Sequence, residues 1–198
     1  MLKLFNKKKF KINLSWLVFD KLFRASLNIF LSIILARNLG PEKFGILNYL
    51  LAFLFLFTSI SSLGMNPVLT NMIIKNKNNN HNIFIMNAYY FRFIFSLINY
   101  LIFVLLIYLI NNDQIYFDYS FIIGIGIILR SCEVFFSYFE AKSLSKYIVI
   151  SQLIGLISAF IFIFYIIRYE LDFIYIFYAL ILFIAACAAG ATFMITGG

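Results

Sequence analysis

Charged residues are scarce in this chain. Only 12% of its 198 residues are Asp, Glu, Lys or Arg, whereas 64% are hydrophobic and the mean hydropathy is +0.97. Soluble domains carry about a quarter charged residues, so this composition excludes that class and predicts a membrane protein. Backbone groups in a bilayer must hydrogen-bond within the protein, and the short alternating segments of a barrel are missing. We therefore predict an all-α integral membrane protein.

Residues that carry most chemistry are also rare. There is one histidine, His81, and the two cysteines, Cys132 and Cys187, lie in apolar surroundings that favour packing over a disulfide or a metal site. No Gly-rich phosphate loop with a lysine is present, and no nucleophile has a histidine base. The sequence thus predicts no metal, no cofactor and no enzyme activity.

Six long apolar runs are present. Short links separate most of them, and the link at residues 37–43 contains Gly40-Pro41, so the second run should return antiparallel to the first. Serine and threonine in the second run are expected to hydrogen-bond to their own backbone or to a neighbouring helix, with contact to a substrate as the alternative. Small residues in the fifth run predict close helix packing. The predicted organisation is a basic N-terminus at 1–13 and a membrane lobe at 14–196 with spans at about 14–36, 44–64, 83–110, 120–139, 147–167 and 173–196.

Basic residues lie mainly at segment ends, which accounts for the net charge of +8 without a nucleic-acid partner. With the N-terminus in the cytoplasm, nine lysines fall inside (3, 7, 8, 9, 11, 75, 77, 142 and 146) and three bases fall outside (37, 43 and 168). This distribution predicts that both ends are cytoplasmic. The lysines at 1–13 act as an orientation anchor or, alternatively, as an anionic-lipid site. The first apolar run is too long for a cleavable signal.

A polar stripe runs along the first span. Asp20, Lys21, Arg24, Asn28 and Ser32 fall within roughly 120° at about 100° per residue. A charge at bilayer depth costs roughly 3 kcal/mol or more, so this stripe should face a packed or water-filled interior rather than lipid.

Two further spans carry intramembrane charge. Arg92, Ser96 and Asn99 share one face of the third span, and Arg130 and Glu133 are three residues apart in the fourth, close enough to pair. With the stripe on the first span, these residues define a candidate substrate path. It comprises Asp20, Lys21, Arg24, Asn28, Arg92, Ser96, Asn99, Arg130 and Glu133.

These charges have more than one explanation. Asp20 with Arg24, and Arg130 with Glu133, could be structural ion pairs, and Lys21 with Arg24 could reach the headgroups. The competing hypothesis is a cationic path for an anionic substrate, because the planar guanidinium binds two phosphate oxygens at once. A proton- or sodium-coupling role for either acid is a third possibility.

Several motifs resemble bacterial polysaccharide flippases, the polysaccharide transporter branch of the multidrug/oligosaccharidyl-lipid/polysaccharide exporter superfamily. They are Ser-Trp-Leu through Arg at 15–24, Leu-Ala-Arg-Asn-Leu-Gly-Pro-Glu-Lys-Phe-Gly at 35–45, Asn-Tyr at 48–49, Ser-Leu-Gly-Met-Asn-Pro at 62–67 and Glu-Ala-Lys-Ser-Leu-Ser-Lys-Tyr at 140–147. The resemblance implies one six-helix lobe of a two-lobe fold, the N-terminal half, with basic residues facing a central cavity. It also implies a bacterial inner-membrane location.

The resulting hypothesis is that the chain, as a truncated or partial transporter, translocates polyprenyl pyrophosphate-linked glycan repeat units across the inner membrane for O-antigen or capsule synthesis. The expected partners are this glycan, the lipid bilayer and a second lobe or chain. Three alternatives stay open: a non-transporting fragment or assembly subunit, a cation-coupled exporter of small molecules, and an integral membrane transferase. The basic interior disfavours a cationic cargo. A transferase would need a catalytic acid or histidine near the membrane face, and the sequence shows none there.

From Ala185 onward the composition changes to Ala, Gly and Thr. This change indicates either a tightly packed helix end or a truncation or reading-frame change.

Overall fold

The longest helix, α1, turns the chain once, at Gly40. In the computed structural model, the described backbone covers residues 7–75, 81–111, 113–142 and 145–196, and side chains are described for residues 18, 21–75, 84–111, 113–142 and 148–187. The elements are α1 (Lys7–Ser62), α2 (Met65–Lys75), α3 (His81–Ile110), α4 (Gln114–Leu129), the 3₁₀ turn η1 (Arg130–Glu133), α5 (Val134–Ala141), α6 (Ser145–Arg168) and α7 (Ile174–Thr196). The described backbone contains no strand, as expected for an all-α membrane fold.

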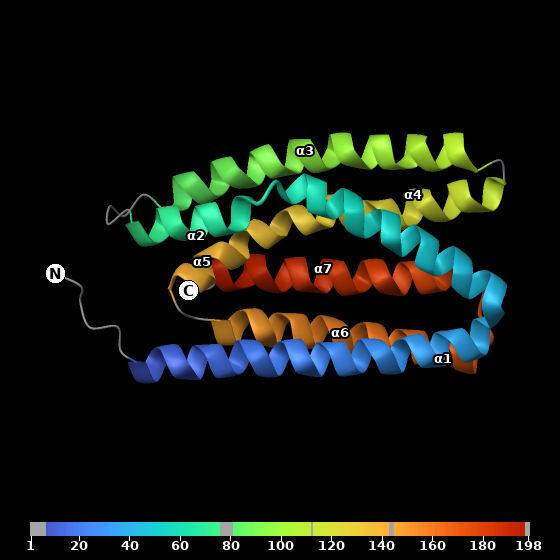
Figure 1. Cartoon of the computed structure of the whole chain (residues 1–198), viewed down its shortest axis with the longest axis horizontal. Helices are drawn as coiled ribbons and strands as arrows, with labels where there is room; N and C mark the ends of the chain where they lie inside the picture. Colours follow the sequence, from blue (N-terminus) through green and yellow to red (C-terminus); the bar gives the residue numbers. More distant parts are fainter. Residues whose placement is uncertain (1–6, 76–80, 112, 143–144, 197–198) are drawn as a thin grey trace.

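Gly40 breaks α1 into two arms. Its φ of 74° and ψ of 171° lie in a region that only glycine adopts readily, and Pro41 then starts the second arm. Figure 1 shows the first arm along α6 and the second arm returning across the bundle toward α2. The predicted antiparallel return is therefore confirmed, but it needs a single non-helical residue instead of a seven-residue link.

The other predicted spans match helices with shifted ends. The fourth predicted span consists of three elements, α4, η1 and α5, because the helix tightens to a 3₁₀ turn at Arg130–Glu133. Among the residues with described side chains, four stretches have the length and apolar character to cross a membrane, at 21–75, 84–110, 114–141 and 148–168, and 174–187 is a shorter apolar helix. The first stretch contains both arms of α1 from residue 21 onward and also α2. The count of six spans stays a prediction.

The helices pack around two groups of buried apolar side chains. The larger core lies among α1, α3, α4, α6 and α7 and includes Leu50, Phe103 and Phe177, each fully buried. The smaller core joins α2, α5 and the first half of α3 and includes the fully buried Val134. Many large apolar side chains remain exposed on the outer faces, as expected for a surface that lipid covers.

Close approach of α6 and α7 depends on small residues. A Cβ on Gly155 would lie 2.9 Å from the Cys187 sulfur and 3.1 Å from the Phe183 carbonyl oxygen. Ser151 Oγ donates to the Cys187 carbonyl at 3.3 Å.

Hydroxyl groups in the second arm of α1 bind to their own helix. Thr58 and Ser59 donate to the Phe55 carbonyl at 2.9 and 2.8 Å. The predicted close packing and own-helix hydrogen bonds are both confirmed.

Candidate functional site

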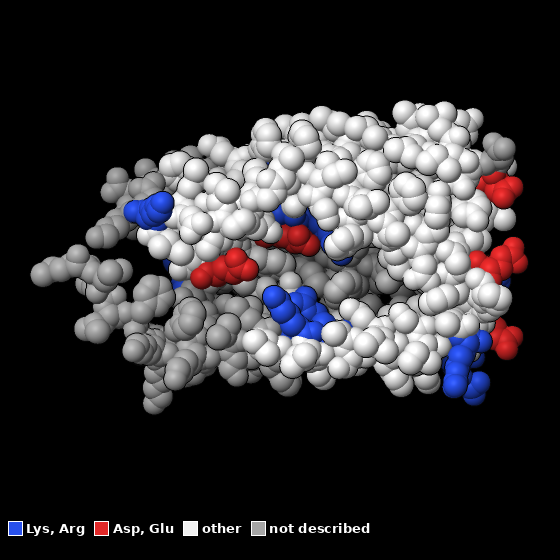
Figure 2. Space-filling view, in the orientation of Figure 1, with Lys and Arg blue, Asp and Glu red and all other residues white. Residues whose placement is uncertain are grey.

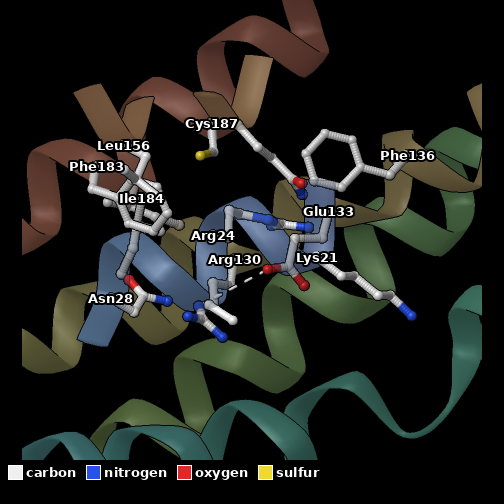
Figure 3. A pocket seen from close by; sticks show the side chains of 13 residues that line it. Lys21, Arg24, Asn28, Arg130, Glu133, Phe136, Leu156, Phe183, Ile184 and Cys187 are labelled. Atoms are coloured by element: carbon white, nitrogen blue, oxygen red, sulfur yellow. Dashed lines mark ion pairs between the residues drawn. The ribbon is translucent and has the colours of Figure 1, made fainter. Parts of the chain in front are cut away.

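A pocket opens between the first arm of α1, the η1 turn, α6 and α7. Its volume is about 470 Å³, within the range of small-molecule sites. Figure 3 shows polar side chains from α1 and η1 on one part of the lining and apolar side chains from α6 and α7 on another. The lining residues are Lys21, Arg24, Ala25, Asn28, Leu129, Arg130, Glu133, Phe136, Gln152, Leu156, Phe183, Ile184 and Cys187.

The first arm of α1 supplies three polar lining residues. Lys21, Arg24 and Asn28 are spaced three and four residues apart, so helical periodicity places them on one face. Arg24 is half-buried, whereas Lys21 and Asn28 are exposed within the described chain. In Figure 3 the Arg24 side chain extends into the pocket, whereas the Lys21 side chain extends away from Arg24. The side chain of Asp20, also predicted for this path, lies outside the described residues.

The η1 turn supplies a base and an acid. Arg130 Nε lies 3.9 Å from Glu133 Oε1, and the two side chains are 33% and 35% exposed. A 3₁₀ turn has three residues per turn, so it holds residues three apart on the same side. The predicted ion pair is confirmed. The distance exceeds that of a hydrogen bond, so the pairing is weak and Arg130 can turn toward a ligand.

Arg92 of α3 pairs with Glu133 from outside the pocket. Its Nη2 donates to Glu133 Oε2 at 3.0 Å, and its Nη1 donates to Asn66 Oδ1 at 2.8 Å. Arg92 is 2% exposed and does not line the pocket. The sequence offered no partner within its own helix. The structure provides partners on η1 and α2. Arg92 therefore contacts a residue that lines the pocket but does not line the pocket itself.

Ser96 and Asn99 are likewise not among the residues that line the pocket. Both are buried, and each donates to a carbonyl of its own helix: Ser96 to Phe93 at 2.8 Å and Asn99 to Phe95 at 2.9 Å. The face they share with Arg92 does point into the bundle. Contact of these two side chains with a substrate stays a prediction, since neither residue lines this pocket.

Sequence reasoning missed Gln152 as a lining residue. It lies on α6, within an apolar span that contains no charged residue. Its buried Oε1 has no hydrogen-bond partner among the described residues. A buried acceptor left without a partner costs about 1–3 kcal/mol, so a ligand hydroxyl or a water would stabilise it. The only sequence signal for this position is that Gln152 places a side-chain amide in an otherwise apolar helix.

The pocket is positively charged. Three basic side chains, Lys21, Arg24 and Arg130, against the Glu133 carboxylate leave a net charge of +2 on its lining. Figure 2 shows basic and acidic side chains along a hollow in the middle of this face, and otherwise mostly near the ends of the bundle. Such a group of basic side chains can bind an anion with two or more oxygens.

The described residues contain no group of three or more His, Cys, Asp or Glu side chains that could hold a metal ion.

Comparison with known proteins gave one finding. A family model described as polysaccharide biosynthesis protein matches residues 10–197. Neither a curated protein nor a solved structure matches the chain.

Proposed function

Because the chain belongs to the polysaccharide biosynthesis protein family, we propose that it translocates polyprenyl pyrophosphate-linked repeat units across the bacterial inner membrane. The family and the apolar helices assign a role in polysaccharide biosynthesis or transport to a multi-pass membrane protein. The observation that carries the finer proposal is the gathering of Lys21, Arg24 and Arg130 in one pocket between membrane helices.

Each lining group has a chemical role in this proposal. Arg24 and Arg130 reach the same pocket from different elements, so their planar guanidinium groups can bind separate phosphates. Lys21 adds a mobile point charge at the side of the pocket. Asn28 and the unpaired Gln152 oxygen would bind hydroxyl groups of the first sugar.

Transport also requires a change of access. We propose that the N-terminus and C-terminus face the cytoplasm. The start of α1 and the end of α7 lie at the same end of the bundle, which supports this arrangement (Figure 1). A second lobe or chain would close the pocket on its open side, and rocking of the two parts would expose it to each leaflet in turn.

Equilibrium binding tests the assigned pocket. We expect the chain in lipid nanodiscs to bind farnesyl pyrophosphate more tightly than farnesol, because only the former carries phosphates. Arg24→Ala and Arg130→Ala should each weaken binding about tenfold or more, the usual cost of one charged hydrogen bond. Arg37→Ala is the matched control, since Arg37 is an exposed base on the same arm of α1 outside the pocket lining.

Movement is tested separately, with a fluorescent lipid pyrophosphate–sugar in proteoliposomes and a membrane-impermeant quencher. The proposal predicts that the chain increases the fraction of lipid reaching the outer leaflet and that the pocket variants reduce it. Binding without movement would favour an assembly subunit or a partial transporter. Equal affinity for farnesol and farnesyl pyrophosphate would contradict the assigned pocket.

A further inference from the structure

The Glu133 carboxylate lies between two arginines that differ in exposure. Arg92 contacts one oxygen at 3.0 Å and is 2% exposed, whereas Arg130 lies 3.9 Å from the other oxygen and is 33% exposed. Glu133 lines the pocket, Arg130 lines it too, and Arg92 does not. The carboxylate thus has a buried partner behind it and an accessible partner beside it.

Arg92 is itself fixed in place. Its second amino group donates to Asn66 Oδ1 at 2.8 Å, and the Asn66 carbonyl accepts from Ser137 Oγ at 3.3 Å. Asn66 lies at the start of α2, and Ser137 lies on α5. Swinging the guanidinium into the pocket would break both of its described hydrogen bonds within a buried site. A direct contact between Arg92 and a ligand is therefore unfavourable.

The pairing has an electrostatic consequence for the pocket. Without Arg92, the Glu133 charge would be compensated only by neighbouring pocket bases, and Arg130 is three residues away on the same turn. The carboxylate would then hold Arg130 and repel an incoming phosphate. With Arg92 in place, the negative charge is neutralised from behind and Arg130 remains at 3.9 Å, beyond hydrogen-bond distance.

We propose that Arg92 is a positioning residue: by hydrogen-bonding Glu133 from outside the pocket, it leaves Arg130 beyond hydrogen-bond distance of that carboxylate and available to an anion. This inference rests on the proposed function of the pocket as the site for a pyrophosphate headgroup. It assigns Arg92 an effect on ligand affinity that acts through Glu133 and requires no contact with the ligand.

The test is a double-mutant cycle on farnesyl pyrophosphate binding in nanodiscs. Arg92→Met should weaken binding about tenfold or more, because Glu133 then neutralises Arg130. Adding Glu133→Gln to this variant should bring the affinity back to within about threefold of wild type. Arg92→Lys keeps the charge behind Glu133 and should also retain binding. Melting temperature and size-exclusion profile establish that each variant is folded.

Two results would overturn the inference. One is unchanged affinity in Arg92→Met, and the other is equal loss in Arg92→Met and in the double variant, which would mean that Arg92 acts by contact or by packing. If Arg92→Met does not fold, Glu133→Gln alone decides, since removal of the carboxylate should tighten binding and a weaker affinity would contradict the scheme. Failure of wild type to prefer farnesyl pyrophosphate over farnesol would instead refute the pocket's proposed function.

Discussion

Replacement of Gly40 by alanine should destabilise the fold through the backbone alone. The residue has φ 74° and ψ 171°, and an added Cβ would meet nothing within 4 Å. No clash is introduced, so the cost is that of holding a residue with a side chain in a region that glycine alone occupies readily. That cost is about 1–3 kcal/mol of unfolding free energy.

The chain offers a matched control five residues further along α1. A Cβ added to Gly45 would also meet nothing within 4 Å, but the φ of Gly45 is not positive and the residue lies within the helical second arm. Gly45→Ala should stabilise the helix by about 0.5–1 kcal/mol, because glycine loses more conformational freedom than alanine on folding. The two variants should therefore change stability in opposite directions.

Reversible unfolding in mixed detergent micelles, with increasing SDS and circular dichroism as the signal, measures both effects. Comparison of the two variants in one lipid and detergent mixture separates the effect of the Gly40 backbone conformation from the effect that any glycine-to-alanine substitution has on a helix. Equal changes in unfolding free energy, or a stabilised Gly40→Ala, would refute the assignment of the α1 turn to the backbone conformation of Gly40.

Further predictions concern packing and orientation. Gly155→Ala should lower the unfolding free energy by about 1–3 kcal/mol in the same titration, because its Cβ would lie 2.9 Å from the Cys187 sulfur; unchanged stability would contradict the close approach of α6 and α7. In a background without Cys132 and Cys187, a cysteine at Asp118 should react with an impermeant thiol reagent in intact cells, whereas one at Lys142 should react only after permeabilisation. The reverse pattern would contradict a cytoplasmic N-terminus.

Helical periodicity made one part of the site predictable. Lys21, Arg24 and Asn28 lie on a single helix, where 100° per residue fixes their relative directions, and the structure does place them in one pocket. The ion pair between Arg130 and Glu133 follows from their spacing of three residues, which places them on one side of either an α-helix or a 3₁₀ turn. Local geometry of this kind needs no knowledge of which helices are neighbours.

Contacts between helices were not predictable in the same way. Arg92 pairs with Glu133, 41 residues later in the chain, and with Asn66 on α2, and no spacing rule indicates either partner. The position of Gln152 in the pocket depends on how α6 rotates against α7. The tightening at η1 also lacks a local signal, since Arg130–Glu133 contains neither proline nor glycine. These features arise from packing, which a single sequence does not specify.

The location of the headgroup phosphates is the most direct test of the account. A spin label on a cysteine at Ala25, which lines the pocket, should broaden the ³¹P signal of bound farnesyl pyrophosphate, because paramagnetic broadening falls steeply with distance. A label at Asp113, before α4 and next to the link that ends α3, should leave the signal much sharper. Strong broadening from Asp113 with little from Ala25 would contradict binding of the phosphates among Lys21, Arg24 and Arg130.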